Sequence, residues 1–127
     1  MTVRIVRLGT PRLKSEGLRI GTVRRPPRGV PKSDYARRHF FDVWFPNLAP
    51  SESLLKAVQP QEEDSWKAFK RRFLKEMKAP EARRCLDLLA VLSQQTDFSV
   101  GCYCEDESRC HRSILRELLG ERGANIE

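Results

Sequence analysis

Hydrophobic and polar residues alternate in two short segments near the start of the chain. The segment VRIVRL, residues 3–8, alternates apolar and basic side chains, which predicts a β-strand with one buried face. The segment LRIGTV, residues 18–23, predicts a second short strand. The Gly, Pro and Ser content of LGTPRLKSEG marks a loop between them. The three prolines and one glycine of RRPPRGVPKSD predict a stiff basic loop after the second strand.

The middle of the chain contains an aromatic segment and then two helical patterns. HFFDVWF, residues 39–45, is aromatic and β-branched and suits a buried strand. Ser51 is a suitable N-cap for a helix, with Glu52 in the first turn. A longer helix is predicted over residues 62–78, because one face carries Trp66, Phe69, Phe73 and Met77 at steps of three and four. We expect the opposite face to lie in solvent; it carries Lys67, Lys70, Arg71, Lys75 and Lys78.

The last third of the sequence predicts a helix, a strand and a final helix. Pro80 suits the first position of a helix that runs to about residue 94. DFSVGCYC, residues 97–104, then reads as a strand, and SRCHRSILRELL reads as a helix closed by Gly120. Helices between strands favour a single three-layer α/β domain over residues 1–127, with a mostly parallel sheet flanked by helices.

Charge is distributed unevenly along the chain. The net charge of +7 arises because residues 1–40 hold 11 Lys/Arg and 2 Asp/Glu, whereas residues 41–127 hold 13 Lys/Arg and 15 Asp/Glu. A segregated basic surface attracts nucleic acid or smaller phosphorylated ligands, and the alternative is a basic surface that only maintains solubility. With 39% hydrophobic and 32% charged residues, we expect a soluble globular protein.

Compartment and redox state follow from what the sequence lacks. No apolar run approaches a membrane span, and the segment MTVRIVRLGT has no signal-peptide core, so we expect no membrane association and a cytoplasmic protein. Thiols are usually reduced there, so the four cysteines do not indicate a disulfide framework.

The start of the final helix is the candidate ligand site. Parallel α/β sheets bind ligands outside the carboxyl ends of their strands. If the strands are parallel, the basic loop after Val23 faces this helix start and supplies three anion-binding candidates, Arg24, Arg25 and Arg28. Helical spacing turns Cys110 and His111 toward the sheet and leaves Arg112 nearer the rim. With Arg112 and Ser113, the unpaired N–H groups of the helix start form an anion cradle.

The cysteines of GCYCEDESRCHRS allow three interpretations. Cys102 and Cys104 share one strand face and, with Cys110 and His111, offer four zinc ligands, although a Cys-x-Cys pair inside an apolar strand is unusual for zinc. Alternatively, the helix start and its basic neighbours lower the pKa of Cys110 and make it reactive, with Cys104 as its partner. Alternatively, the thiols only fill tight space, an interpretation that we favour for Cys102.

The chain resembles the domain of unknown function 488 family. The resemblance spans nearly the whole chain and is carried by RIGTVRRPPRGVPK, DVWFPNLAPS, WKAFKRRFLKEM and VGCYCEDESRCHRSIL. It implies one compact three-layer α/β domain and matches the family pattern at Cys104, Cys110, His111, Arg112, Arg25 and Arg28. The chain has Arg24 where relatives often have an acidic residue, and Gln59-Pro60 where many have a histidine. A mechanism that needs either group is not expected here.

These observations lead to competing functional hypotheses. The first is a phosphate-directed site acting on nucleic acid, in which a hydrolytic version needs carboxylates to hold Mg²⁺ or Mn²⁺. Asp42 and Glu105 are the candidate carboxylates, and His111 is the candidate base. The others are a thiol enzyme that uses Cys110 with Cys104, a zinc-stabilised domain without catalysis, and a binding module for an acidic protein.

Overall fold

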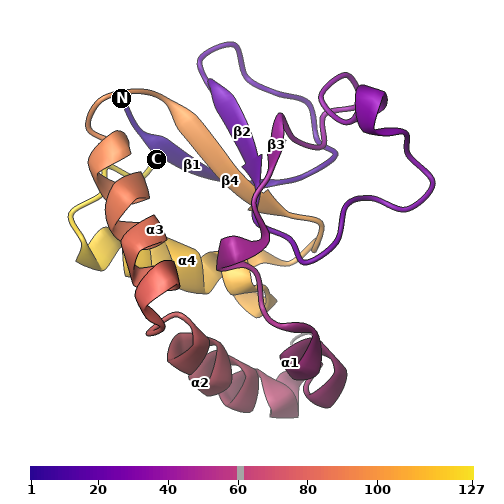
Figure 1. Cartoon of the computed structure of the whole chain (residues 1–127), viewed down its shortest axis with the longest axis vertical. Helices are drawn as coiled ribbons and strands as arrows, with labels where there is room; N and C mark the ends of the chain where they lie inside the picture. The colour runs from indigo at the N-terminus through magenta and orange to yellow at the C-terminus, as the bar shows by residue number, and fades with distance from the viewer. Residues whose placement is uncertain (60–61) are drawn as a thin grey trace.

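The computed structural model describes residues 1–59 and 62–127. Within these residues, four strands form one sheet in the order β1-β4-β2-β3, and every pairing is parallel (Figure 1). The strands are β1 (Val3–Arg7), β2 (Leu18–Gly21), β3 (Val43–Trp44) and β4 (Phe98–Cys102). The predicted α/β class with a parallel sheet is confirmed. No helix in the described part of the chain is long and apolar enough to cross a membrane.

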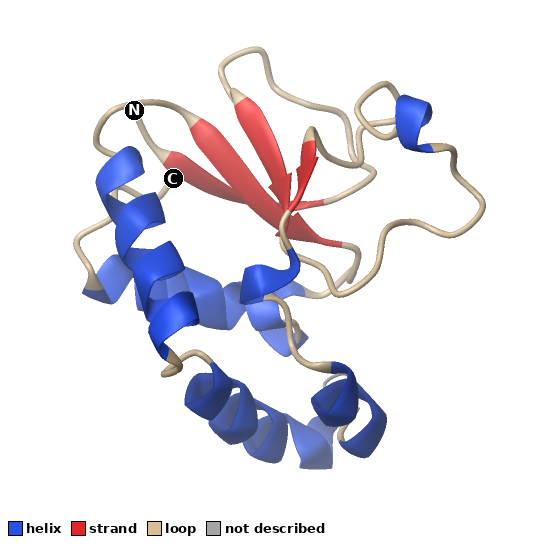
Figure 2. Ribbon diagram, in the orientation of Figure 1, coloured by secondary structure: helices blue, strands red, loops and turns tan. Residues whose placement is uncertain are grey.

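In the described part of the chain, the four α-helices lie on one side of the sheet (Figure 2). They are α1 (Glu52–Ala57), α2 (Trp66–Glu76), α3 (Pro80–Leu92) and α4 (His111–Glu121). The main core lies between them and the sheet, where Phe98 and Val100 of β4 pack with Phe69 and Phe73 of α2. The other side of the sheet is covered by irregular chain: Phe41 packs against Gly21, where a side chain would collide with its ring. The sequence predicts helices on both sides of the sheet, but the layer opposite the helices consists of irregular chain.

Local sequence signals explain where α1 and α3 begin. The Ser51 hydroxyl accepts a hydrogen bond from the Leu54 N–H and caps α1, as predicted. Pro80 occupies the first turn of α3, also as predicted. The helix predicted over residues 62–78 is present as α2, preceded by a short 3₁₀ turn at residues 63–65.

Two sequence predictions differ from the structure. The strand predicted over residues 39–45 is reduced to β3, because His39 has a left-handed backbone (φ 64°) and Phe41 folds onto the face of the sheet. The final helix does not end at Gly120 but continues to Glu121. The chain leaves it at Gly123, whose φ of 80° suits a helix terminus.

Candidate functional site

A pocket of about 250 Å³ lies between the end of β2, the end of β4 and the start of α4. The arrowheads of β2 and β4 point to the same edge in Figure 1, which is where parallel sheets bind ligands. The pocket wall includes the basic side chain of Arg24, the amide of Gln59 and the phenol of Tyr103. Its remaining polar lining comes from Cys102, Cys104, Cys110 and His111, which we name the thiol–imidazole cluster.

The sulfur and nitrogen atoms of this cluster lie within contact distance. The thiols of Cys102 and Cys110 and a ring nitrogen of His111 all lie within 4.8 Å of one another. The Cys102 Sγ is 3.6 Å from the Cys104 Sγ, and the Cys110 Sγ is 3.8 Å from the His111 Nδ1. Residues from the end of β4 and from the start of α4 therefore converge on a single point.

One hydrogen bond fixes the orientation of the His111 ring. Its Nε2 is 2.6 Å from the backbone oxygen of Thr22, at the end of β2. A carbonyl oxygen only accepts, so Nε2 carries the proton and Nδ1 presents a lone pair toward Cys110. Burial lowers the pKa of His111 to about 4, so the ring is neutral at neutral pH. The prediction that this side chain turns toward the sheet is confirmed.

Cys110 differs from the reactive thiol that its place at the helix start suggests. Its side chain is fully buried and packs with Val23, Phe41 and Cys102. Hydrogen bonds with Cys102 and Cys104, together with burial, raise the pKa of the Cys110 thiol far above its usual range. The expected lowering by the helix start is outweighed, so the free thiol of Cys110 is a poor nucleophile.

Two arginines beside the cluster have charges without a carboxylate partner. Arg24 donates to the backbone oxygens of Pro46, Ala49 and Pro50. Arg112 donates to the backbone oxygen of Cys104 at 2.6 Å, and its Nε has no hydrogen-bond partner. Among the residues that the structure describes, neither guanidinium takes part in an ion pair. Arg112 is buried rather than at the rim, because its side chain is only 3% exposed.

The remaining basic and hydroxyl candidates lie apart from the pocket. Arg25 is exposed and paired with Glu52. Arg28 is also exposed and borders a separate shallow cleft with Pro26, Pro27 and Tyr103. The Ser113 hydroxyl donates to the Cys110 backbone oxygen at 2.9 Å, inside its own helix. Of the three arginines expected to face α4, only Arg24 lines the pocket.

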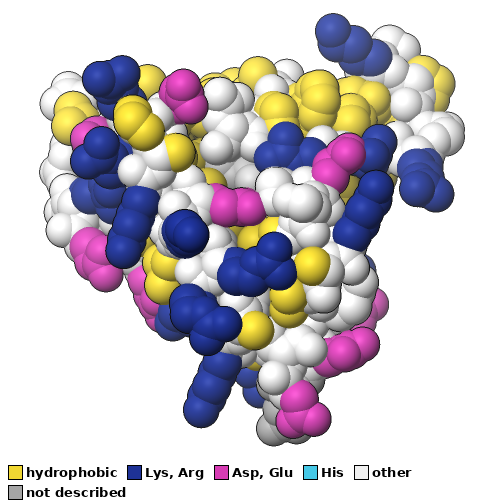
Figure 3. All heavy atoms as spheres, turned by 60° about the horizontal axis from the view of Figure 1, so that its bottom comes forward, with side chains coloured by type: hydrophobic (Ala, Val, Ile, Leu, Met, Phe, Trp, Pro, Cys, Tyr) yellow, Lys and Arg dark blue, Asp and Glu magenta, His cyan; other side chains and the backbone are white. Residues whose placement is uncertain are grey.

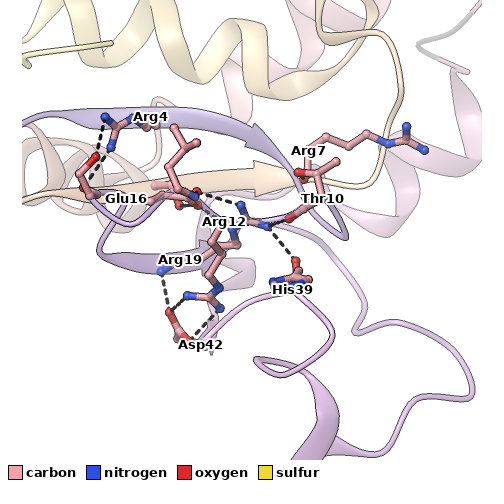
Figure 4. Close-up of polar contacts among 11 residues, drawn as sticks. Arg4, Arg7, Thr10, Arg12, Glu16, Arg19, His39 and Asp42 are labelled. Carbon is pink, nitrogen blue, oxygen red and sulfur yellow. Dashed lines mark hydrogen bonds and ion pairs between the residues drawn. The ribbon is translucent and has the colours of Figure 1, made fainter.

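The two carboxylates expected to hold a metal are engaged elsewhere. Asp42 accepts two hydrogen bonds from the Arg12 guanidinium and one from the Arg19 backbone N–H, as Figure 4 shows. Glu105 is 84% exposed and pairs with Arg7 at 3.5 Å. Neither residue lines the pocket, so the expectation that they join His111 in a hydrolytic centre is not met. Asp106 instead caps the 3₁₀ turn that precedes α4.

Sequence reasoning missed one contact of the site, the Thr22 backbone oxygen. Cys102, which the sequence offered as a zinc ligand but favoured as a packing residue, is buried in an apolar cluster and also lies within reach of Cys110 and His111. Its signal was the alternation of Cys102 and Cys104 on one strand face. The Thr22 backbone oxygen carries no side-chain signal at all, because any residue supplies it. Many relatives have a histidine where this chain has Gln59-Pro60. Gln59 lines the pocket, and Pro60 lies outside the described residues.

Comparison with known proteins gives one family match. Residues 3–123 match the family model DUF488-N3a, which is described as the active DUF488-N3 subclade. No curated protein and no solved structure matches the chain significantly.

Proposed function

This chain belongs to the DUF488 family, and we propose that it uses the thiol–imidazole cluster to bind one Zn²⁺ ion beside a pocket for an anionic ligand. The observation that carries the proposal is the convergence of the Cys102 and Cys110 thiols and a ring nitrogen of His111 within 4.8 Å. The description of the matched subclade as active supports a site with chemistry over a purely structural one.

The distances support a tetrahedral ion. Zinc–sulfur bonds of about 2.3 Å place two thiolate ligands of one tetrahedral ion about 3.8 Å apart. The Cys110 Sγ–His111 Nδ1 distance of 3.8 Å is close to that value, and the ligand atoms of Cys102, Cys110 and His111 all lie within 4.8 Å of one another. The Thr22 carbonyl also holds the far side of the His111 ring, as carbonyls commonly do behind histidine ligands.

The ligand types favour zinc over the Mg²⁺ or Mn²⁺ expected with carboxylates. Thiolate and imidazole are soft or intermediate ligands that suit Zn²⁺, whereas Mg²⁺ prefers oxygen. Asp42 and Glu105 are paired with arginines outside the pocket. A metal-dependent reaction at this site would therefore rely on sulfur and nitrogen ligands.

The charge balance supports an anionic ligand. Two thiolates, of Cys102 and Cys110, would neutralise the charge of Zn²⁺. The charges of Arg24 and Arg112, which form no ion pair among the described residues, would remain beside the site. A phosphate-bearing ligand would complement them. If Cys104 stays outside the coordination shell, Cys102, Cys110 and His111 would hold the ion beside the pocket, and a bound Zn²⁺ would supply Lewis acidity there.

Metal analysis tests the proposal directly. The purified chain is titrated with Co²⁺, which reports thiolate ligation by its absorption, and bound zinc is measured by elemental analysis. We expect one ion per chain with thiolate–cobalt absorption, and loss of both in Cys110→Ser. Inorganic phosphate should bind the zinc form more tightly than the metal-free form.

Cys85→Ser is the matched control, because Cys85 lies in α3 outside the cluster and is also a free thiol. It should bind metal as the unchanged chain does. Failure to bind Zn²⁺ or Co²⁺ at micromolar concentration, or equal binding by Cys110→Ser, would overturn the zinc centre.

A thiol-based activity is the second candidate, and one observation favours it. Cys104 is half-buried, lines the pocket and has its sulfur 3.6 Å from that of Cys102. Full burial makes Cys110 the less accessible thiol. In this alternative Cys104 attacks the substrate, and zinc should inhibit rather than support activity.

A further inference from the structure

A broad, open depression of about 910 Å³, which we call the α2 groove, lies among the side chains on the outer face of α2. It is lined by Leu74 and by six basic side chains: Lys67, Lys70, Arg71, Arg72, Lys75 and Lys78. Figure 3 shows Lys and Arg side chains spread over the face that comes forward when the bottom of Figure 1 is turned toward the viewer. The opposite side of the same helix is buried through Phe69 and Phe73.

The charge of this groove is largely uncompensated. Among the residues that the structure describes, its lining contains no acidic side chain. Among the described residues, only Lys70 of the six takes part in an ion pair, with Glu117 at 3.1 Å. Charge counted along the chain assigns the positive excess to residues 1–40, yet α2 and the residues just after it present a second basic surface, which the sequence predicted only as a solvated face.

We propose that the α2 groove binds the phosphate backbone of a nucleic-acid duplex. Lys67, Arg71 and Lys75 follow one another at steps of four residues, which is a rise of about 6 Å for each step along a helix. They therefore form a row of cations parallel to the helix axis. A duplex presents about one phosphate charge per 1.7 Å of its axis, so such a row meets several phosphates at once.

The lining of the groove favours a duplex over a single strand. Proteins that bind single strands stack bases on aromatic side chains, and no aromatic residue lines this groove. The aromatic residues of α2 are engaged elsewhere: Phe69 and Phe73 are buried, and Trp66 stacks on Phe69 at 5.8 Å and has Arg109 over its ring. An acidic protein is less suited, because stable protein interfaces need an apolar centre and the groove offers only Leu74.

The groove also has a defined relationship to the pocket. On the inner side of α2, the Phe73 ring contacts the His111 ring edge-on at a centroid distance of 5.6 Å. A duplex on the outer side would therefore lie across one helix from the thiol–imidazole cluster. The inference does not depend on zinc, because no groove residue belongs to the cluster.

This inference is tested with a fluorescent DNA duplex of about 20 base pairs. Its binding to the chain is measured by fluorescence anisotropy across a range of salt concentrations. The groove variant combines Lys67→Gln, Arg71→Gln and Lys75→Gln. The control combines Lys14→Gln, Arg28→Gln and Lys32→Gln, three exposed residues of the N-terminal third that form no ion pair among the described residues. Both variants lose three charges. We expect the groove variant to lose about tenfold or more in affinity and to show a shallower salt dependence, and the control to lose much less.

Several results would overturn the inference. These are no duplex binding at low salt, equal loss in the two variants, tighter binding of the single strand, or complete displacement of the duplex by polyglutamate at equal charge. Circular dichroism of both variants excludes unfolding as the cause of a loss. Cys110→Ser should bind the duplex as the unchanged chain does, so failure of the zinc proposal and failure of this one are distinguishable.

Discussion

The Nε2 atom of His111 donates to the backbone oxygen of Thr22, 89 positions away in the sequence, at 2.6 Å. This contact joins the first residue of α4 to the residue that follows β2. It also decides which ring nitrogen remains available to a ligand, because the proton on Nε2 leaves Nδ1 with a lone pair. One hydrogen bond thus links the parallel sheet to the chemistry of the cluster.

Replacement of His111 should affect both stability and metal binding. His111→Ala leaves the Thr22 oxygen unpaired and opens a cavity against Phe73, so we expect a loss of about 2–4 kcal/mol in the free energy of unfolding. In the unchanged zinc-loaded chain, a chelator should lower the melting temperature, and in His111→Ala this difference should largely disappear. A full chelator effect in the variant would show that the ring is not a metal ligand.

The order in which the cysteines react should follow their exposure. In the metal-free chain we expect iodoacetamide to modify Cys104 before Cys110, because Cys104 is half-buried at the pocket and Cys110 is fully buried. Zn²⁺ should protect Cys104 from modification only if the Cys104 thiol is itself a metal ligand. Cys85 should react at the same rate with and without metal. Peptide mass mapping over time measures these rates. Modification of Cys110 first would contradict the burial argument.

The buried ion pair of Glu16 and Arg19 should make stability depend on pH. Burial alone would raise the pKa of Glu16, but hydrogen bonds from Arg19 and Ser99 outweigh it and hold the pKa below its ordinary 4.5. The native carboxylate therefore binds a proton less readily than the unfolded one. Its stabilisation is present above about pH 4.5 and is lost as the pH falls through the lower native value.

Glu16→Gln tests that dependence. At neutral pH the variant should lose about 3–5 kcal/mol, because the Arg19 side chain, 1% exposed, loses the carboxylate that accepts its hydrogen bonds. Its unfolding free energy, measured with denaturant, should also decline less steeply between pH 5 and pH 3 than that of the unchanged chain, roughly the range over which a carboxyl of lowered pKa titrates. If the unfolding free energies of the two proteins fall equally steeply with pH, the acid sensitivity comes from carboxyl groups other than Glu16.

Arg24 should stabilise the pocket wall through its geometry as well as its charge. It donates to three backbone oxygens between Pro46 and Pro50, and a lysine at this position keeps the charge but cannot span all three. We expect Arg24→Lys to lose about 1–3 kcal/mol in unfolding free energy and to weaken phosphate binding to the zinc form. Calorimetric unfolding and phosphate titration measure the two effects. An unchanged phosphate affinity would place the anion away from Arg24.

Much of the fold follows from local sequence. Alternation in residues 3–8 and 18–23 identified β1 and β2, and the Trp66–Phe69–Phe73 stripe identified α2, because burial of one face imposes a fixed period. The Ser51 cap and Pro80 marked two helix starts. The predicted strand over residues 39–45 was mostly wrong, because aromatic content records burial and not the left-handed turn at His39.

The candidate site depended on tertiary structure. The sequence alone determined that Cys110 and His111 lie at a helix start and that Cys102 and Cys104 share a strand face, since these relationships depend only on local periodicity. Only the folded chain decided that these groups meet, that Asp42 and Glu105 are held elsewhere by Arg12 and Arg7, and that Arg112 is buried. The physical reason is that such contacts depend on strand order, here β4 between β1 and β2, and no local pattern encodes that order.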